Sequence, residues 1–303
     1  MKFALPRVSP RVEPQDYWKW NLPILSLTTF LTVVSFSLVF PFLPLFVQEL
    51  GVADPGQAAF WSGIAGGFMG AALAISGPFW GIMGDRYGRK KNLLRAFFLG
   101  AIPMGLMGLS GNVYQLVLLR FVGGLFSGSF STAMALAASQ SPSHRVAYSI
   151  GIIQTGSFLG STLGPFLGGV LADAVGLRYV FFFSGGGLMV GGVLAALLIK
   201  EDFHRPQELE AMKMRDYGKA MVAMVSSREL LPLLVVIFLI QLVPSVMFPV
   251  LPLFLGELAG EDSSVTSLAG IAFAFMGIAS SVAAVGVARL SRQFTLKGLL
   301  VAC

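Results

Sequence analysis

The sequence is poor in the residues from which catalytic, metal and disulfide sites are built. It contains one cysteine, Cys303, and two histidines, His144 and His204. A single cysteine excludes a disulfide bond within the chain, and neither H-E-x-x-H nor G-x-S-x-G occurs. These shortages argue against a membrane-embedded enzyme, and we expect neither a bound metal nor a cofactor.

Charge is also scarce. Charged residues make up 12% of the chain, whereas hydrophobic residues make up 55% and the mean hydropathy is +0.77. This composition is too apolar for a soluble domain. The net charge is +6, but the basic residues fall in short groups between long uncharged stretches, which excludes a nucleic-acid partner. We expect a membrane protein surrounded by lipid.

Eight uncharged stretches are long enough to cross a bilayer as helices, which takes about 20 residues. They lie at 22–47, 58–84, 96–119, 121–143, 146–172, 179–199, 230–256 and 263–288. Between 96 and 143 the only charge is Arg120, and the turn-forming triplet Ser110-Gly111-Asn112 predicts a break between two helices. The predicted fold is an all-α membrane protein.

The basic residues predict the orientation. With the N-terminus inside, all of the 21 lysines and arginines except Arg120 and Arg178 fall on the cytoplasmic side, as the positive-inside rule requires. The first residues lack the apolar core of a signal peptide. We therefore expect a multi-pass protein of the inner cell membrane with a cytoplasmic N-terminus.

Two stretches far apart in the chain repeat each other. Residues 40–50 read FPFLPLFVQEL and residues 248–258 read FPVLPLFLGEL, and SGIAGGFMG at 62–70 matches AGIAFAFMG at 269–277. Duplicated helical halves are typical of membrane carriers, in which the substrate path lies between two bundles. The repeat therefore favours a carrier.

The repeat divides the chain into a cytoplasmic tail (1–19), a complete six-helix bundle (20–199), a polar linker (200–229) and a partial second bundle (230–303). Apolar residues on one helical face of the linker predict an amphipathic helix on the membrane surface. The second bundle holds about two and a half helices, because a ninth apolar segment is cut short at Cys303. We expect a truncated carrier that is inactive alone.

The loop after the second span reads GIMGDRYGRK, with defined residues Gly81, Asp85, Arg86, Gly88, Arg89 and Lys90. Gly81 and Gly84 would let two helices approach closely, and Gly88 suits a turn with positive φ. Asp85 suits an ion pair or a helix N-terminus. An ordinary cytoplasmic loop would need the cations but neither the acid nor the glycines.

This loop resembles the G-x-x-x-D-R-x-G-R-K signature of the major facilitator superfamily. The resemblance implies two six-helix bundles that rock about a central path, with Asp85, Arg86 and Arg89 latching the cytoplasmic side against the other half. The equivalent loop at 288–297 keeps cations but lacks the acid and the glycine.

The fifth span carries closely spaced small residues, namely Gly160, Gly164, Pro165, Gly168 and Gly169. They resemble the antiporter motif of the twelve-helix drug/proton antiporter branch; the alternative is a general packing face of small residues. Residues 61–81 and 176–183 also resemble multidrug efflux carriers of that branch. The resemblance implies proton-driven export of lipophilic small molecules by a monomeric full-length carrier.

Proton handling is less directly indicated. Arg120 resembles a family motif whose arginine is linked to proton transfer; the alternative is an arginine that extends to the membrane surface. Many such antiporters carry an acid in the first span, and residues 22–47 have none. The proton is expected to be handled by Asp173 with Arg120, or by an acid in helices that this chain lacks.

Two further sets of residues are candidates, one for hinges between moving helices and the other for a substrate cavity. The candidate hinges are Pro41, Pro44, Pro249 and Pro252, which could instead mark simple helix ends. The candidate cavity residues are Phe36, Phe126, Phe130, Gln154, Thr155, Phe158 and Gln241. Apolar walls with a few polar groups suit lipophilic substrates, although each of these side chains could face lipid.

Two other functions stay open at this point. An uptake carrier or facilitator of the same fold would take a small polar solute and would need charged or amide-rich cavity walls. A packing or sensor protein without transport activity is the other alternative.

Overall fold

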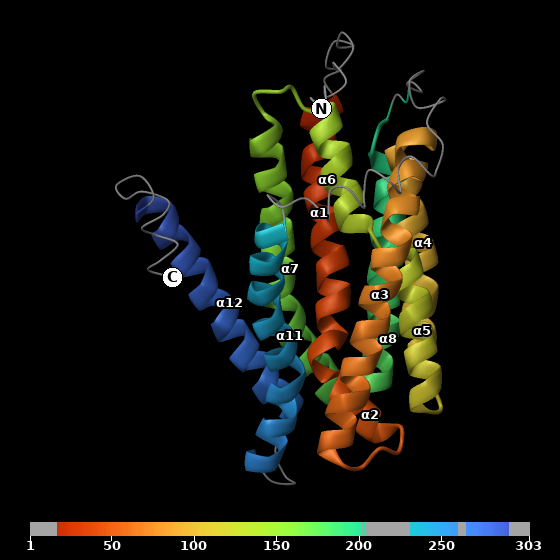
Figure 1. The fold of residues 1–303 in the computed structure, drawn as a ribbon, viewed down its shortest axis with the longest axis vertical. Coiled ribbons are helices and arrows are strands. Elements are labelled where there is room, and N and C mark those ends of the chain that lie inside the picture. Colours follow the sequence, from red (N-terminus) through yellow and green to blue (C-terminus); the bar gives the residue numbers. More distant parts are fainter. Residues whose placement is uncertain (1–16, 202, 204–230, 260–264, 291–303) are drawn as a thin grey trace.

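The computed structural model describes residues 17–201, 203, 231–259 and 265–290, and most of them are helical (Figure 1). The long helices of the first half are α1 (Tyr17–Val39), α3 (Pro55–Tyr87), α4 (Arg89–Met107), α5 (Val113–Phe126), α6 (Ser129–Gln140), α7 (Val146–Val175) and α8 (Leu177–Leu198). The short η1 (Phe40–Phe42) and α2 (Leu43–Glu49) continue α1, and α11 (Leu231–Ala259) and α12 (Val265–Leu290) belong to the second half. The predicted surface helix of the linker lies outside the described residues.

Five helical segments of the described chain are long and apolar enough to cross a membrane, namely Tyr17–Glu49, Pro55–Tyr87, Val113–Gln140, Val146–Val175 and Leu177–Leu198. The helices α4, α11 and α12 occupy the other three predicted spans. The predicted all-α membrane fold is confirmed.

The predicted break after the third span is also confirmed. Helix α4 ends at Met107, and α5 begins after Asn112, whose side chain accepts a hydrogen bond from the backbone N–H of Gln115 at 3.0 Å. An asparagine at this position satisfies one of the free N–H groups that begin a helix. The triplet that predicted the break therefore also supplies the cap.

Helix α4 starts earlier than its uncharged stretch predicted, at Arg89 instead of near residue 96. Its first turns are basic, and three of the cations donate to backbone carbonyls of neighbouring helices. Arg89 binds the carbonyl of Ala135, and Lys90 binds that of Ile199. These contacts stabilise the charged residues within the helix, so that α4 begins before the uncharged stretch from which the span was predicted.

The fourth span is broken, which the sequence did not predict. Between α5 and α6 the chain turns at Gly128, which has a φ of 113°. Arg95 lies over the ring of Trp80, 3.7 Å from its centroid, and donates to the carbonyls of Phe126 and Ser127 at 3.1 and 3.3 Å. In a membrane such carbonyls need a partner, and Arg95 supplies it from α4.

Helix α1 is the centre of the first half, and it packs against α6, α7 and α8 (Figure 1). The N-terminal part of α12 packs on α7, and its C-terminal part diverges from the bundle. We call the end that holds Tyr17, Gly88 and Leu198 the basic end. The other end holds α2 and the turns at 50–54, 108–112 and 176.

The two copies of the repeat differ in local structure. In the first copy, α1 is followed by the short 3₁₀ helix η1, which contains Pro41. Helix α2 then begins at Leu43, with Pro44 in its first turn. In the second copy the corresponding prolines, Pro249 and Pro252, lie within the continuous helix α11. Hinge action at these prolines stays a prediction.

Candidate functional site

The motif loop forms the turn between α3 and α4 at the basic end. Gly88 ends α3 with a φ of 105°, a value that strains any residue with a side chain. A Cβ added there would also lie 3.0 Å from the Oε2 atom of Glu201. The predicted positive φ of Gly88 is therefore confirmed.

Asp85 forms an ion pair across this turn. Its Oδ1 atom accepts hydrogen bonds from Nε and Nη2 of Arg89 at 3.1 and 2.9 Å. The Nη1 atom of Arg89 donates to the carbonyl of Ala135 in α6 at 2.7 Å. The expected pairing of Asp85 is thus present, and both partners belong to the first half.

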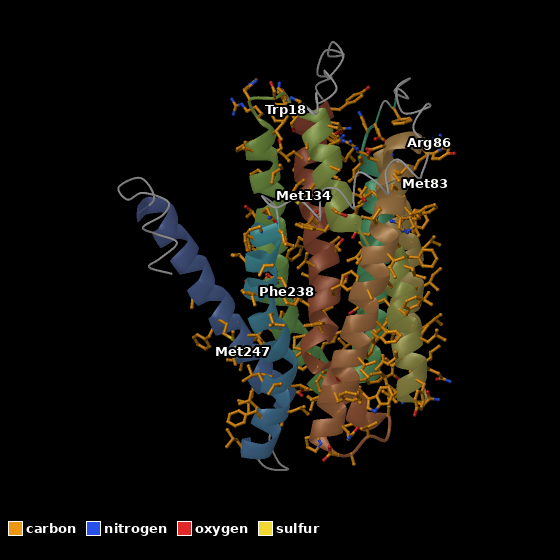
Figure 2. All side chains as sticks on the ribbon, in the orientation of Figure 1. Trp18, Met83, Arg86, Met134, Phe238 and Met247 are labelled. Atoms are coloured by element: carbon orange, nitrogen blue, oxygen red, sulfur yellow. The ribbon has the colours of Figure 1, made fainter. Side chains whose placement is uncertain are left out.

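Arg86 and Gly81 of the motif lack comparable contacts within the described residues. The Nε atom of Arg86, whose side chain lies at the basic end (Figure 2), is buried without a hydrogen bond there. A Cβ on Gly81 would meet no described atom within 4 Å, whereas one on Gly84 would lie 3.0 Å from Nδ2 of Asn92. Close helix approach is therefore found at Gly84 and not at Gly81. Contact between this loop and the second half stays a prediction.

Glu201 is a site residue that the sequence did not reveal. Its two carboxylate oxygens accept hydrogen bonds from the backbone N–H groups of Arg89 and Lys90, both at 2.9 Å. An acid at a helix N-terminus satisfies free N–H groups and interacts favourably with the helix dipole. Glu201 thus caps α4 although it follows α8 in the chain. The only feature of the sequence that could have indicated this role is the position of an acidic residue directly after the last span of the first bundle.

Neighbouring residues fasten the same segment to two other helices. The Nζ atom of Lys90 donates to the carbonyls of Ala196 and Ile199 at 2.8 and 2.6 Å. The buried amide of Asn21 in α1 exchanges hydrogen bonds with the backbone N–H and carbonyl of Lys200 at 2.9 and 2.6 Å. Residues 199–201, here called the 199–201 clasp, join α1, α4 and the end of α8.

The glycines of α7 allow close contact with α1. A Cβ on Gly160 would lie 2.9 Å from Cβ of Val33, one on Gly164 would overlap Ser37, and one on Gly168 would overlap the backbone of Leu38. Any larger residue would push the two helices apart. The glycines therefore form the close packing face that the sequence offered as the alternative, and an antiporter role of this motif stays a prediction.

Helix α7 also packs closely against α12 of the second half. A Cβ on Gly169 would overlap the backbone of Thr266, and one on Gly270 of α12 would lie 3.0 Å from the carbonyl oxygen of Pro165. Farther along, Gly277 faces Thr162 in the same way. Pro165 and Gly169 of the antiporter-like motif therefore lie where the two halves meet, whereas Gly160, Gly164 and Gly168 face α1.

Arg120 is buried in the first half. Its side chain is 2% exposed, Nη1 lies 3.5 Å from the sulfur of Met69, and Nε and Nη2 have no hydrogen-bond partner in the described chain. An arginine that extended to the membrane surface would be exposed, so that alternative is wrong. A buried guanidinium without oxygen partners is costly, which marks Arg120 as a functional candidate.

Asp173, the suggested partner of Arg120, has other contacts. It accepts hydrogen bonds from the Thr266 hydroxyl and from the backbone N–H of Ser267 at 3.1 Å. Both donors lie in the first turn of α12. The structure therefore places Asp173 at the contact between the halves, and the pairing with Arg120 is not found among the described residues.

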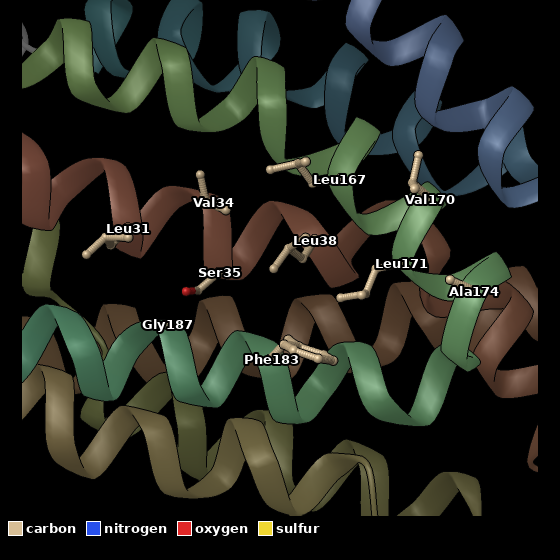
Figure 3. Close-up of a pocket in the computed structure, with 10 residues that line it drawn as sticks. All are labelled: Leu31, Val34, Ser35, Leu38, Leu167, Val170, Leu171, Ala174, Phe183 and Gly187. Carbon is tan, nitrogen blue, oxygen red and sulfur yellow. The ribbon is translucent and has the colours of Figure 1, made fainter.

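An apolar cavity of about 390 Å³ lies between α1, α7 and α8 (Figure 3). Its walls include Leu31, Leu38, Leu167 and Phe183, and the hydroxyl of Ser35 is the polar side-chain group that lines it. Such a cavity suits an apolar molecule. Of the predicted cavity residues whose side chains are described, none lines it.

The predicted cavity residues have varied surroundings. Phe36 and Phe130 pack against the core, the ring of Phe126 lies 6.3 Å from that of Trp80, Gln154 is half-buried, and Phe158 is 65% exposed. The hydroxyl of Thr155 donates to the carbonyl of Gly151, and the side chain of Gln241 lies outside the description. A shared substrate site for these residues stays a prediction.

Comparison with known sequences identifies relatives along nearly the whole chain. The profile of the Major Facilitator Superfamily matches residues 25–303. The multidrug resistance protein MdtG of Enterobacter lignolyticus is 37% identical over 285 residues, which cover 94% of this chain and 68% of the relative. MdtG of Salmonella typhimurium is 36% identical over 284 residues, covering 94% and 70%.

Solved structures show the same fold. A bacterial homologue of the human lysosomal transporter Spinster, in an inward-facing and unoccupied conformation, has a TM-score of 0.65 at 17% identity and covers 93% of this chain and 64% of its own. A D-xylose–proton symporter has a TM-score of 0.63 at 17% identity, covering 92% and 70%. At these identities the comparison concerns the fold alone.

Proposed function

Because the chain belongs to the major facilitator superfamily, we propose that it acts in a multidrug efflux transporter that exports lipophilic small molecules in exchange for protons. The observation that carries this proposal is the 37% identity to a multidrug resistance protein over 94% of the chain. Transport would proceed by alternating access, in which the two halves rock about a central path.

The packing around α7 supports a rocking mechanism. Backbone contacts at Gly169 and Gly270 bring the two halves together without long side chains between them. Helices that meet through small residues can approach closely and form a well-defined contact in lipid. We propose that α7 and α12 are the pair about which the halves move.

The motif loop and Arg120 have separate proposed roles. The Asp85–Arg89 pair and Glu201 hold the Gly88 turn rigid, and Arg86 would contact the second half when the basic end closes. Arg120 would take part in proton coupling, because its desolvated charge makes it sensitive to any nearby change in protonation.

The proposed location is the inner cell membrane, with the basic end facing the cytoplasm. Nearly all basic residues then lie inside. The exception at the opposite end is Arg178, which donates to the carbonyls of Gly108 and Ser110 at 3.2 and 2.9 Å. A cation that completes a helix C-terminus has a structural reason to depart from the rule. The carrier would act as a monomer.

A cellular assay tests the proposed direction of transport. In a bacterial strain without its own efflux pumps, expression of a full-length carrier that contains this chain should lower the steady-state accumulation of a lipophilic fluorescent dye. Raised accumulation would instead indicate uptake, and unchanged accumulation of a panel of lipophilic dyes would oppose the multidrug assignment. The matched control is Gly168→Leu, which should fail to lower accumulation because it separates α7 from α1.

A further inference from the structure

Two glycines of α3 have counterparts in the repeat that lie in a close contact between helices. Gly63 of α3 matches Gly270 of α12, and Gly70 matches Gly277, each counterpart being 207 residues farther along the chain. Seven residues make nearly two turns of a helix with about 3.6 residues per turn, so Gly63 and Gly70 lie on one face of α3. Helices α3 and α12 therefore carry the same two small residues at the same spacing.

In the second half, these glycines are the points at which α12 meets α7. A Cβ added to Gly270 would lie 3.0 Å from the carbonyl oxygen of Pro165, and one added to Gly277 would overlap the side chain of Thr162. Beyond Gly277 the C-terminal part of α12 diverges from the bundle (Figure 1). Small residues let helices approach closely in lipid. The part of α12 that binds α7 thus includes both glycines.

In the first half, the same face of α3 is exposed. A Cβ added to Gly63 or Gly70 would meet no described atom within 4 Å, and both glycines are exposed. Helix α11 also contacts α3, but it brings no described atom within that distance of either position. The opposite face of α3 is buried at Ala65 and Ala72. One face of α3 therefore packs in the first half, and the other presents the two glycines.

The symmetry of the superfamily connects these observations. Its two halves are parallel repeats related by an axis along the membrane normal. In a two-fold arrangement, a contact between two different surfaces occurs twice, with the surfaces exchanged between the halves. The contact of α7 with α12, the counterpart of α3, therefore requires a second contact between α3 and the second-half counterpart of α7.

We propose that Gly63 and Gly70 form the face of α3 on which the fifth helix of the second half docks, the helix that is the repeat counterpart of α7. This helix lies outside the part of the carrier that the chain spans, since α11 and α12 are the first two helices of the second half. The chain covers 68% and 70% of two of its relatives, so those proteins have further segments that could supply it. The proposal does not depend on the direction of transport.

Two other occupants fit the observations less well. A second molecule of this chain would offer its own α7, but α12 already covers that helix at Thr162 and Pro165. Lipid could cover the face, but lipid contact gives no reason for glycine, which disfavours a helix, at both positions that the repeat shares. A helix that approaches as closely as α7 approaches α12 accounts for both glycines.

Thermal unfolding in detergent tests the proposal when each substitution is made both in this chain and in a full-length carrier that contains it. Gly63→Leu and Gly70→Leu should leave the unfolding temperature of this chain unchanged. In the full-length carrier they should lower it by about as many degrees as Gly270→Leu, which overpacks the contact with α7. Ile75→Trp is the control, because Ile75 is exposed on the same helix about 140° from Gly70, and it should change neither temperature.

Disulfide formation identifies the docked helix and gives a second measurement. Gly67 lies between the two glycines and matches Ala274, so a contact of this kind accepts a Cβ there. Gly67→Cys is combined with single cysteines along each further helix of a full-length carrier whose other cysteines, Cys303 included, are replaced by serine. A disulfide requires Cα atoms within about 7 Å, so oxidation should link Gly67→Cys to one face of the fifth helix of the second half. Ile75→Cys should not form this link.

Three outcomes would overturn the proposal. In the full-length carrier, Gly63→Leu and Gly70→Leu could leave the unfolding temperature unchanged while Gly270→Leu lowers it, which would leave the face to lipid. Gly67→Cys could form its disulfide with another helix, or with none. This chain could form a dimer that Gly70→Leu dissociates, which would make a second molecule the occupant.

Discussion

The carboxylate of Asp173 accepts a hydrogen bond from the backbone N–H of Ser267 at 3.1 Å, and a second one from the Thr266 hydroxyl. Asp173 is near the end of α7, whereas both donors lie in the first turn of α12. A side chain of the first half therefore stabilises the N-terminus of a second-half helix. This contact fastens the halves at the end of the bundle opposite the Gly88 turn.

Removal of this carboxylate should loosen the first turn of α12. For Asp173→Ala we expect a loss of about 1 kcal/mol in the local stability of that turn, the usual effect of deleting a helix cap. Hydrogen exchange at the Ser267 amide should accelerate by roughly fivefold, the factor that corresponds to that energy. Asp173→Asn keeps an acceptor oxygen and should show a smaller effect.

Asp54 provides the control for this experiment. It caps α3 within the first half by accepting a hydrogen bond from the N–H of Gln57 at 2.7 Å. Asp54→Ala should accelerate exchange at the start of α3 and leave α12 unchanged. Equal protection of Ser267 in wild type and Asp173→Ala would show that this contact does not hold the halves together.

Even one methyl group should disturb the contact between α7 and α1. In Gly168→Ala the new Cβ would overlap the backbone of Leu38, which cannot rotate away, so we expect a destabilisation of about 1–3 kcal/mol. Thermal unfolding in detergent measures it. Gly151→Ala is the matched control, because Gly151 lies on the same helix and a Cβ there meets nothing within 4 Å. Equal unfolding temperatures for the two variants would argue against tight packing at Gly168.

Loss of Glu201 should free the start of α4. In Glu201→Ala the N–H groups of Arg89 and Lys90 lose their acceptors, and we expect about 1 kcal/mol of destabilisation with faster hydrogen exchange at these two amides. Glu49→Ala removes an exposed acid at the opposite end and should leave them unchanged. Unaltered hydrogen exchange in Glu201→Ala would show that Glu201 does not stabilise the start of α4.

Much of the fold follows from local sequence. The apolar stretches predicted helices because lipid requires internally satisfied backbone groups, and Ser110-Gly111-Asn112 predicted a turn because such residues favour one. Gly88 was predicted correctly for the same reason, since its positive φ is a property of a single residue. These features depend on a few neighbouring residues.

The features that the sequence did not reveal depend on contacts between distant residues. The break before α6 is stabilised by Arg95 and Trp80 from two other helices, and α4 is capped by Glu201, which is far along the chain. The partner of Asp173 also escaped prediction, because a carboxylate can bind either a cation or a helix N-terminus. Only the packed structure decides between those partners.

In a full-length carrier that contains this chain, Asp85→Asn should lower transport while leaving the amount of protein in the membrane unchanged. An asparagine keeps the shape but removes the charge that orients Arg89, and a partly exposed pair contributes only about 1 kcal/mol or less to stability. Dye efflux and immunoblotting of membranes measure the two quantities. Arg89→Lys keeps the charge without the two-atom contact to Asp85 and should show an intermediate rate. Normal efflux by Asp85→Asn would exclude a role for this pair in transport.

The most direct test of proton-driven export uses everted inner-membrane vesicles that contain a full-length carrier with this chain as its first part. With an interior made acidic by respiration, the vesicles should accumulate a lipophilic dye, since the outer face of the carrier now lies inside, and an uncoupler should release it. Vesicles with Arg120→Gln should accumulate less dye at equal protein content, because the buried charge at Met69 is removed. Dye accumulation that persists undiminished after the uncoupler collapses the proton gradient would contradict proton antiport.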